Sequence, residues 1–240
     1  GTVYVERELA DSNSILQSIE LSCLAQKQWQ QTSLMERARI CEGAVAYFES
    51  KQTQIAEEIA WQMGRPVAFA GGEVNGLAER ARLMIAIAEQ SLADVVPEAK
   101  AGLKRFIRRE PVGVVFTIAP WNYPLLTSVN SIVPALMAGN SVLLKASAQV
   151  PLCGEHFAQA FRSAGLPEGV FQNLLLSHED TERIVNSGQM DFICFTGSVP
   201  AGQRIEQAAA GTFAGVALEL GGKDPAYVVE DANFVDAVEN

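Results

Sequence analysis

Several short apolar runs of the sequence end in, or contain, a polar side chain that could do chemistry. The four side chains of this kind are Asn122, Lys145, Ser198 and Glu219. Short apolar runs bounded by turn residues are typical of buried β-strands, and ligands of an open parallel sheet bind outside the carboxyl ends of its strands. The spacing therefore predicts that these side chains gather along one ligand-binding edge.

Asn122 and Glu219 suggest acyl chemistry. Asn122 lies in a loop held by two prolines, and its amide N–H groups could stabilise a negative oxygen that develops in a transition state. Glu219 interrupts the apolar run 215–220, where we expect it to be buried and poised to take a proton from water. The alternatives are a turn asparagine and a structural carboxylate paired with a backbone amide or with Lys223.

Lys145 and Ser198 suggest nucleotide binding. A lysine that ends a buried strand could reach a ribose hydroxyl or a phosphate, although a lysine that extends to water is the common alternative. Ser198 follows Gly197 and precedes Pro200, so we expect it to cap a helix whose free N–H groups face a pyrophosphate. An ordinary capped turn would have the same sequence. The usual glycine-rich dinucleotide fingerprint is absent from the chain.

The elements that must position these side chains fall into two regions. Residues 14–91 carry apolar residues at three- and four-residue spacing, which predicts helices. From residue 103 onward apolar runs alternate with helical stretches, which predicts a doubly wound α/β fold with a parallel sheet covered on both faces. The predicted strands are 114–118, 142–144, 170–176, 192–195 and 216–220, and the predicted helices between them are 126–138, 152–163, 178–187 and 199–209.

Composition limits the partners and the compartment. The net charge of −10, from 18 basic and 28 acidic residues, argues against binding to nucleic acid or to an anionic membrane surface. No apolar run reaches the roughly 18 residues that a membrane span needs. The most basic stretch, 104–109, is short and is predicted to be an exposed strand. Four cysteines without a regular spacing indicate a reducing compartment, so we expect a cytoplasmic protein.

A series of short motifs runs in order along almost the whole chain. They are Met63–Pro66 with Glu73 and Val74, Glu110–Val114, Pro120–Pro124, Pro134–Asn140, Ala164–Pro167, Phe195–Ser198 and Leu218–Lys223. This ordered set resembles the aldehyde dehydrogenase superfamily. The combination of Leu218–Lys223 with Thr196–Val199 looks most like its succinate-semialdehyde branch. The resemblance implies that residues 1–219 form a Rossmann-like NAD(P)-binding domain with amino-terminal helices. Residues 220–240 would begin a catalytic domain that is incomplete here.

The resemblance also implies roles for individual residues. Asn122 would be the side-chain half of an oxyanion hole, and Glu219 would activate the water that hydrolyses a thioester. Lys145 would contact the adenosine ribose of NAD or NADP, and Ser198 with its helix would hold the pyrophosphate. No metal is implied. The full set of implied cofactor-binding residues is Ile118, Trp121, Lys145, Ser147, Ala148, Gly197, Ser198 and Leu220.

The sequence departs from the family pattern at two points. The family's nucleophilic cysteine lies well after the segment that ends at Lys223, and no cysteine follows Lys223 here. We therefore expect the chain to be the amino-terminal half of a longer enzyme and to be inactive alone. Ala148 stands where many NAD-preferring members carry a glutamate that grips the ribose hydroxyls, so the choice between NAD and NADP stays open.

The leading hypothesis is an NAD(P)+-dependent dehydrogenase that oxidises a small aldehyde to a carboxylic acid through a cysteine thioester. We expect a homodimer or homotetramer in which residues 103–112 form part of an oligomerisation hairpin. Two alternatives stay open. One is a CoA-acylating or acyl-phosphate-reducing dehydrogenase, which would not need Glu219 to activate water. The other is a non-catalytic nucleotide-binding or scaffold protein of the same fold.

Overall fold

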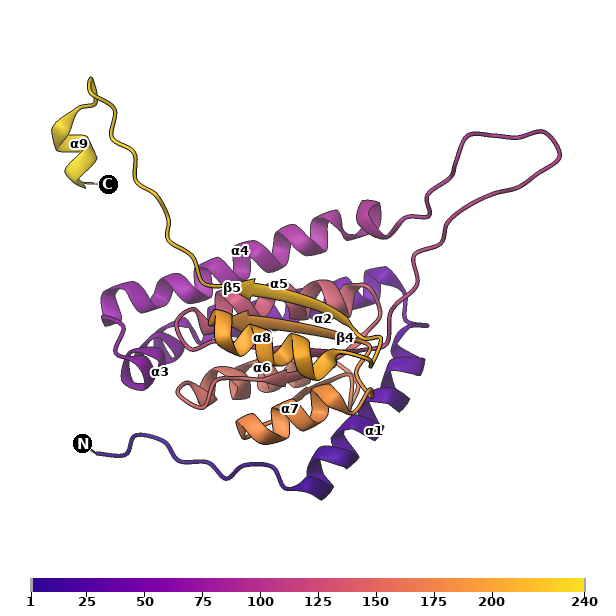
Figure 1. Cartoon of the computed structure of the whole chain (residues 1–240), viewed down its shortest axis with the longest axis horizontal. Helices are drawn as coiled ribbons and strands as arrows, with labels where there is room; N and C mark the ends of the chain where they lie inside the picture. Colours follow the sequence, from indigo (N-terminus) through magenta and orange to yellow (C-terminus); the bar gives the residue numbers. More distant parts are fainter. Residues whose placement is uncertain (1, 240) are drawn as a thin grey trace.

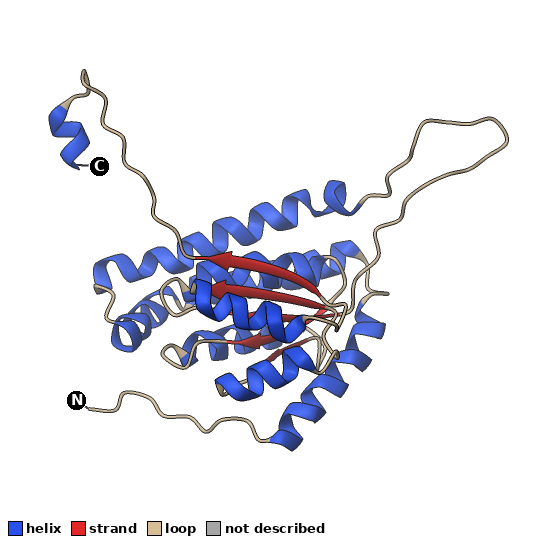
Figure 2. Ribbon diagram, viewed as in Figure 1, coloured by secondary structure: helices blue, strands red, loops and turns tan. Residues whose placement is uncertain are grey.

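Residues 2–239 are described by the structure, which is a computed structural model. Four helices come first, and strands then alternate with helices (Figures 1 and 2). The strands are β1 (Val114–Ile118), β2 (Ser141–Lys145), β3 (Phe171–Asn173), β4 (Phe192–Gly197) and β5 (Gly215–Leu220). The helices are α1 (Ser12–Trp29), α2 (Leu34–Ser50), α3 (Gln52–Met63), α4 (Val67–Leu92), α5 (Pro124–Met137), α6 (Pro151–Ser163), α7 (His178–Asn186), α8 (Val199–Ala209) and α9 (Phe234–Glu239).

The five strands form one parallel sheet in the order β3-β2-β1-β4-β5. The chain winds outward from β1 to β3, returns to the other side of β1 as β4, and then continues to β5. This change of direction makes the space between β1 and β4 the topological switch point, where open α/β sheets bind their ligands. The predicted doubly wound α/β fold with amino-terminal helices is confirmed.

Helices cover both faces of the sheet, because β1 and β2 are fully buried and need apolar partners on each side. On one face α2 to α6 pack with side chains such as Val115, Val142 and Leu144. On the other face α7, α8 and the first turns of α1 pack with side chains such as Phe116, Leu143 and Ile193. Figure 2 shows the red strands between these two helical layers. The sheet therefore presents its carboxyl edge as the open place between two cores.

Two sequence expectations about strands are wrong. Residues 103–109 form no strand; single antiparallel bridges join Val95 to Ile107 and Lys100 to Leu103 in a long excursion away from the body (Figure 1). A two-stranded hairpin is marginal without a third strand or a packed helix, and this one has neither within residues 2–239. β3 is also shorter than 170–176. It ends at Asn173, and the carbonyl of Leu175 beyond it accepts a hydrogen bond from the amide of Ala10 in the amino-terminal arm.

Beyond Leu220 the chain leaves the sheet. Residues 221–231 are exposed, and they lead to the short helix α9, which lies away from the body (Figure 1). Among residues 2–239, no helix combines the length and apolar character needed to cross a bilayer. The body of the chain is therefore the sheet with its two helical layers, and the carboxyl edge of that sheet is where the candidate residues lie.

Candidate functional site

The carboxyl ends of the central strands are level with one another. Ile118 at the end of β1 pairs with Lys145 of β2 on one side and with Phe195 of β4 on the other. Gly197 at the end of β4 pairs with Leu220 at the end of β5. This register places the sequence-predicted residues along one edge of the sheet, as the strand pattern predicted.

A cavity of about 440 Å³ opens at this edge on the face covered by α7 and α8. We call it the α7–α8 cavity. It is formed by the ends of β1, β2 and β4 together with the first turns of both helices. Four of the predicted cofactor-binding residues line it: Ile118, Lys145, Ser147 and Ser198. The other four, Trp121, Ala148, Gly197 and Leu220, lie at the same edge but are not part of its lining.

Lys145 is the unusual residue of the α7–α8 cavity. Lys145 is only 6% exposed, so its side chain does not extend into bulk water. Burial lowers the pKa of its ammonium below the ordinary value of 10.5, since nothing replaces the lost hydration. Within residues 2–239 no side chain or carbonyl accepts a hydrogen bond from this ammonium. A buried and unpaired cation that faces a cavity is suited to an anionic or hydroxyl-bearing ligand.

Helix α8 points its first turn at the same cavity. Ser198 is the N-cap: its hydroxyl accepts a hydrogen bond from the amide of Ala201 at 3.4 Å, and Pro200 occupies the first turn. The predicted cap is therefore present. Close approach of the helix to β5 depends on Gly202, because a Cβ atom there would lie 2.4 Å from the side chain of Leu220. The free amides of this turn can receive an anion.

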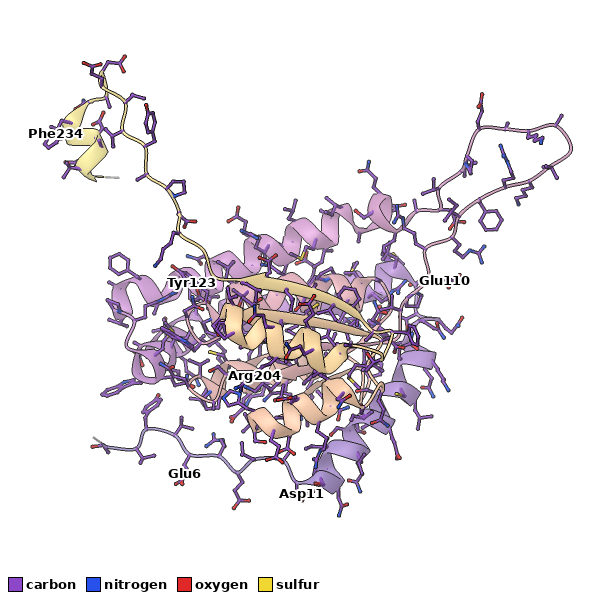
Figure 3. All side chains as sticks on the ribbon, viewed as in Figure 1. Glu6, Asp11, Glu110, Tyr123, Arg204 and Phe234 are labelled. Carbon is purple, nitrogen blue, oxygen red and sulfur yellow. The ribbon has the colours of Figure 1, made fainter. Side chains whose placement is uncertain are left out.

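Three charged or titratable residues that line the α7–α8 cavity were not identified from the sequence: Arg204, His178 and Glu182. Arg204 lies on α8 and His178 begins α7, and both line the cavity with Lys145. Arg204 is labelled in Figure 3 on the helix in front of the sheet. The signal for Arg204 was its place within two turns of the Ser198 cap.

A second cavity, of about 400 Å³, lies on the opposite face of the sheet between α4, α5 and β5. We call it the α4–α5 cavity. Glu219 lines it, together with Arg80 of α4 and Asn130 of α5, which are 3.5 Å apart through Arg80 Nη1 and Asn130 Oδ1. The two cavities share Ile118, Ala119, Pro120 and Phe195. They therefore meet at the loop that follows β1.

Glu219 is exposed within residues 2–239, so the expectation of a buried carboxylate is wrong here. The reason is the strand alternation: Val216, Leu218 and Leu220 face the core under α8, whereas Glu219 faces the opposite side, which α4 and α5 cover only partly. β5 is also an edge strand of the sheet. An apolar run in an edge strand does not bury both of its faces.

Asn122 lies on the loop where the two cavities meet. The residue is exposed and lines neither cavity, although Pro120 before it lines both. Its backbone carbonyl accepts a hydrogen bond from Arg65 Nη2 at 2.8 Å. Trp121 beside it is 48% exposed. The loop thus presents polar and aromatic side chains outward, next to the cavity that holds Glu219.

The four cysteines are poor nucleophiles in this chain. Cys41 and Cys153 are buried, and burial raises the pKa of Cys41 to about 12 and that of Cys153 further still. Burial also raises the pKa of Cys194 to about 11, and that of Cys23 above its usual range. The thiolate is the reactive form, so very little of it exists at neutral pH. Residues 2–239 also hold no cluster of side chains suited to a metal ion.

The Aldehyde dehydrogenase family model matches residues 1–240. The chain belongs to the aldehyde dehydrogenase family. A probable succinate-semialdehyde dehydrogenase (NADP+) of Synechocystis sp. is 36% identical over 203 residues, which make up 85% of this chain and 44% of that protein. This chain thus spans about half the length of such curated aldehyde dehydrogenases.

Solved structures of aldehyde dehydrogenases share the fold. A putative aldehyde dehydrogenase from Burkholderia cenocepacia superposes with a TM-score of 0.94 at 29% identity, over 100% of this chain and 49% of that one. An NADP-dependent glyceraldehyde-3-phosphate dehydrogenase from Bacillus halodurans, complexed with NADP, gives 0.86 at 32% identity, over 94% and 48%. The predicted family and fold are confirmed by these comparisons.

Proposed function

We propose that this chain is the cofactor-binding half of an enzyme that oxidises an aldehyde to a carboxylic acid with NAD+ or NADP+. The observation that carries the proposal is the α7–α8 cavity at the switch point of the sheet, with the buried, unpaired Lys145 in its wall. A relative of similar fold is complexed with NADP. The chemistry of the cavity, a cation and a helix N-terminus beside apolar walls, suits a dinucleotide.

Each residue of the edge takes one task in this proposal. Lys145 and Ser147 bind the adenosine ribose or its phosphate, and the first turn of α8 at Gly197 and Ser198 receives the pyrophosphate. Ile118 and Trp121 flank the cleft, Ala148 leaves room near the ribose, and the Leu220 backbone lies toward the nicotinamide. A nicotinamide bound there would supply the hydride acceptor for the oxidation.

Asn122 and Glu219 act on the substrate in the proposed reaction. A cysteine thiolate from the portion of the enzyme that follows residue 240 adds to the aldehyde carbon. Asn122 donates a hydrogen bond to the oxygen that becomes negative, and a thioester remains after hydride transfer. Glu219 then takes a proton from the water that hydrolyses this thioester. Its exposure here fits a base that faces the α4–α5 cavity and that further residues would cover.

The α4–α5 cavity favours an aldehyde that carries a second, anionic group. Arg80 is the one cationic residue among its lining residues within 2–239, and its guanidinium is held toward Asn130. A carboxylate at the far end of the substrate would complement Arg80 in a partly water-excluded space. The names of several relatives specify succinate semialdehyde, which is an aldehyde of this kind.

We also propose the wider setting of the enzyme. The excursion 93–113 exposes Leu103, Phe106 and Ile107, which would be covered if it served as an oligomerisation hairpin in a homodimer or homotetramer. All four cysteines are free thiols, which fits a reducing, cytoplasmic compartment. Residues 1–219 would be the cofactor domain, and 220–240 the start of the catalytic domain.

The test uses the protein together with the portion that follows residue 240. NAD(P)H formation is measured with a panel of aldehydes that differ only in a terminal carboxylate or methyl group. We expect aldehyde-dependent reduction with a lower KM for the carboxylated member. Absence of reduction with every aldehyde, in a sample that binds NADP+, would contradict the enzymatic proposal and favour a non-catalytic nucleotide-binding protein.

A further inference from the structure

The carboxylate of Glu73 lies in the middle of the core-facing stripe of α4. Its side chain is only 1% exposed, and its neighbours on the stripe, Ala70, Val74 and Leu77, are fully buried apolar residues. Charge in such a place costs several kcal/mol unless it is paired and hydrogen-bonded. A carboxylate there therefore needs compensating partners, and those partners indicate what it does.

One carboxylate oxygen of Glu73 binds the start of α5. Its Oε2 accepts hydrogen bonds from the amides of Leu125 at 3.1 Å and Leu126 at 3.3 Å. These amides belong to the first turn of α5, whose own N-cap residue, Tyr123, provides no side-chain cap. Glu73 thus supplies the missing cap from a different helix, and its negative charge also favours the positive end of α5.

Arg65 completes the arrangement from the other side. Its Nη1 donates to Glu73 Oε1 at 2.9 Å, its Nη2 donates to the carbonyl of Asn122 at 2.8 Å, and its guanidinium lies 4.4 Å from the centre of the Tyr123 ring. Only 15% of its side chain is exposed. One ion pair therefore holds the carbonyl of residue 122, the ring of residue 123 and the first amides of α5. Figure 3 marks Tyr123 near the carboxyl edge of the sheet.

The side chain of Asn122, unlike its carbonyl, has no hydrogen-bond partner within residues 2–239. The residue is also exposed. The position of this side chain therefore depends on the loop backbone that carries it. That backbone is anchored at its carbonyl by Arg65, and at the next helical turn by Glu73.

We propose that Arg65 and Glu73 are positioning residues that aim the amide of Asn122 at the oxygen of the reacting aldehyde. The proposal rests on the proposed function, because it needs Asn122 to be the oxyanion donor. Arg65 is suited to this task because its planar fork donates in two directions at once. A lysine could pair with Glu73 or with the carbonyl of Asn122, but not with both in this geometry.

The geometric part is tested on the 240-residue chain itself. Glu73→Gln replaces a charged acceptor with a neutral one of the same shape, which is roughly half as strong. We expect amide hydrogen exchange at Leu125 and Leu126 to become about tenfold faster. Arg82→Met is the matched control, since Arg82 is on the same helix and forms an equally close pair with Glu49, at 2.7 and 2.8 Å, on the exposed face. Unchanged exchange in Glu73→Gln would overturn the capping role.

The functional part is tested on the protein together with the portion that follows residue 240. The rate of the first turnover is measured by stopped flow, and the Kd for NADP+ by calorimetry. We expect Arg65→Met to slow the first turnover by about 10²-fold, the effect of a small misplacement of a catalytic group, with the Kd unchanged. Arg65→Lys should recover part of the rate, and Arg82→Met should match the parent.

A double variant separates positioning from general destabilisation. In an Asn122→Ala background, Arg65→Met should slow the first turnover by less than about threefold, because the group that it positions is already gone. The same loss in both backgrounds would overturn the proposal, as would a folded Arg65→Met protein with the parental rate. If the parent itself produces no NAD(P)H, the proposed function has failed and the positioning role falls with it, while the exchange measurement still decides the capping role.

Discussion

At the scale of single residues, the buried ammonium of Lys145 links ligand binding to proton uptake. Burial lowers its pKa below 10.5 in the free chain, and an anionic or hydroxyl-rich cofactor would raise that pKa again. Binding should therefore take up a proton at pH values between the lowered pKa and 10.5. By linkage, the affinity for NADP+ should fall as pH rises through this window, because the free chain then has to be protonated first.

Calorimetry checks this prediction. The binding enthalpy of NADP+ at a pH within this window should differ between two buffers with different ionisation enthalpies, and the difference should vanish in Lys145→Met. Lys104→Met is the control, since Lys104 lies exposed in the excursion far from the sheet edge. A pH-independent affinity in the parent would contradict the role of Lys145.

Ala148 leads to a prediction about cofactor choice. It is exposed on the turn after β2, next to Ser147, whose hydroxyl accepts from the amide of Gln149 at 3.3 Å. No carboxylate at position 148 would grip the ribose hydroxyls or repel a 2′-phosphate. We therefore expect the enzyme to accept NADP+ appreciably. A kcat/KM for NAD+ that exceeds that for NADP+ by more than ~1000-fold, roughly 4 kcal/mol, would contradict this expectation.

Transient kinetics should distinguish the role of Glu219 from that of Asn122. Glu219→Gln keeps the size of the side chain and removes the base, so hydrolysis should slow by about 10²–10⁴-fold while the first turnover survives. Reduced cofactor would appear as a burst close to one equivalent, followed by a slow steady rate. Asn122→Ala should instead weaken the burst, by about 10²–10³-fold in rate. A folded Glu219→Gln protein with the parental steady rate would end the role of Glu219 as a base.

At the scale of elements, the start of β1 depends on Gly113. Its φ of +131° is a conformation that other residues rarely adopt. A Cβ atom there would lie 2.0 Å from Asp191 Oδ2, the oxygen that accepts the amide of Val114 at 2.8 Å. β1 is the central strand and carries the switch-point loop, so strain at Gly113 would reach the site.

Gly113→Ala should therefore lower the free energy of unfolding by roughly 2–4 kcal/mol, from backbone strain together with the displaced Asp191. Urea denaturation of the 240-residue chain measures it. Gly222→Ala is the matched control, since no atom lies within 4 Å of a Cβ built there and its φ is not positive; it should change stability by less than about 0.5 kcal/mol. Equal stabilities of the two variants would show that β1 tolerates a side chain at position 113.

The boundaries of most elements could be predicted from the sequence, because their signals are local. Ser198 caps α8 as expected, and the apolar runs 114–118 and 192–195 are strands. The errors arise where burial or pairing depends on an element that is distant in the sequence. The exposure of Glu219 depends on which face of the edge strand the helices cover, and the chain just after β3 pairs with the amino-terminal arm.

The candidate site could be predicted less completely than the fold. Residues at strand ends were identifiable because the parallel sheet brings them together. Arg80, Arg204 and the pair Arg65–Glu73 act from helices, and only the tertiary structure brings their side chains to the edge. One local signal existed, since Glu73 interrupts an apolar helical stripe between Ala70 and Leu77.

At the scale of the whole molecule, the side of the sheet around the α4–α5 cavity is only partly covered by helices. Ala217 and Glu219 are exposed on β5, and the segment after Leu220 contacts little of the body. The aldehyde dehydrogenases that this chain resembles are about twice as long. We propose that further residues cover this side of the sheet, exclude water from the cavity and supply the nucleophile.

The last prediction follows from the proposal that the nucleophile comes from outside residues 1–240. The 240-residue chain alone should bind NADP+ but should not oxidise aldehydes, because none of its four cysteines is suited to attack. Cys41 and Cys153 are buried, and the thiols of Cys23 and Cys194 have raised pKa values, that of Cys194 about 11. NADPH formation is followed with a mass-verified sample, and the protein with the following portion serves as the positive control. NADPH produced by the 240-residue chain at the rate of that control would show that the chemistry does not need a thiol from outside.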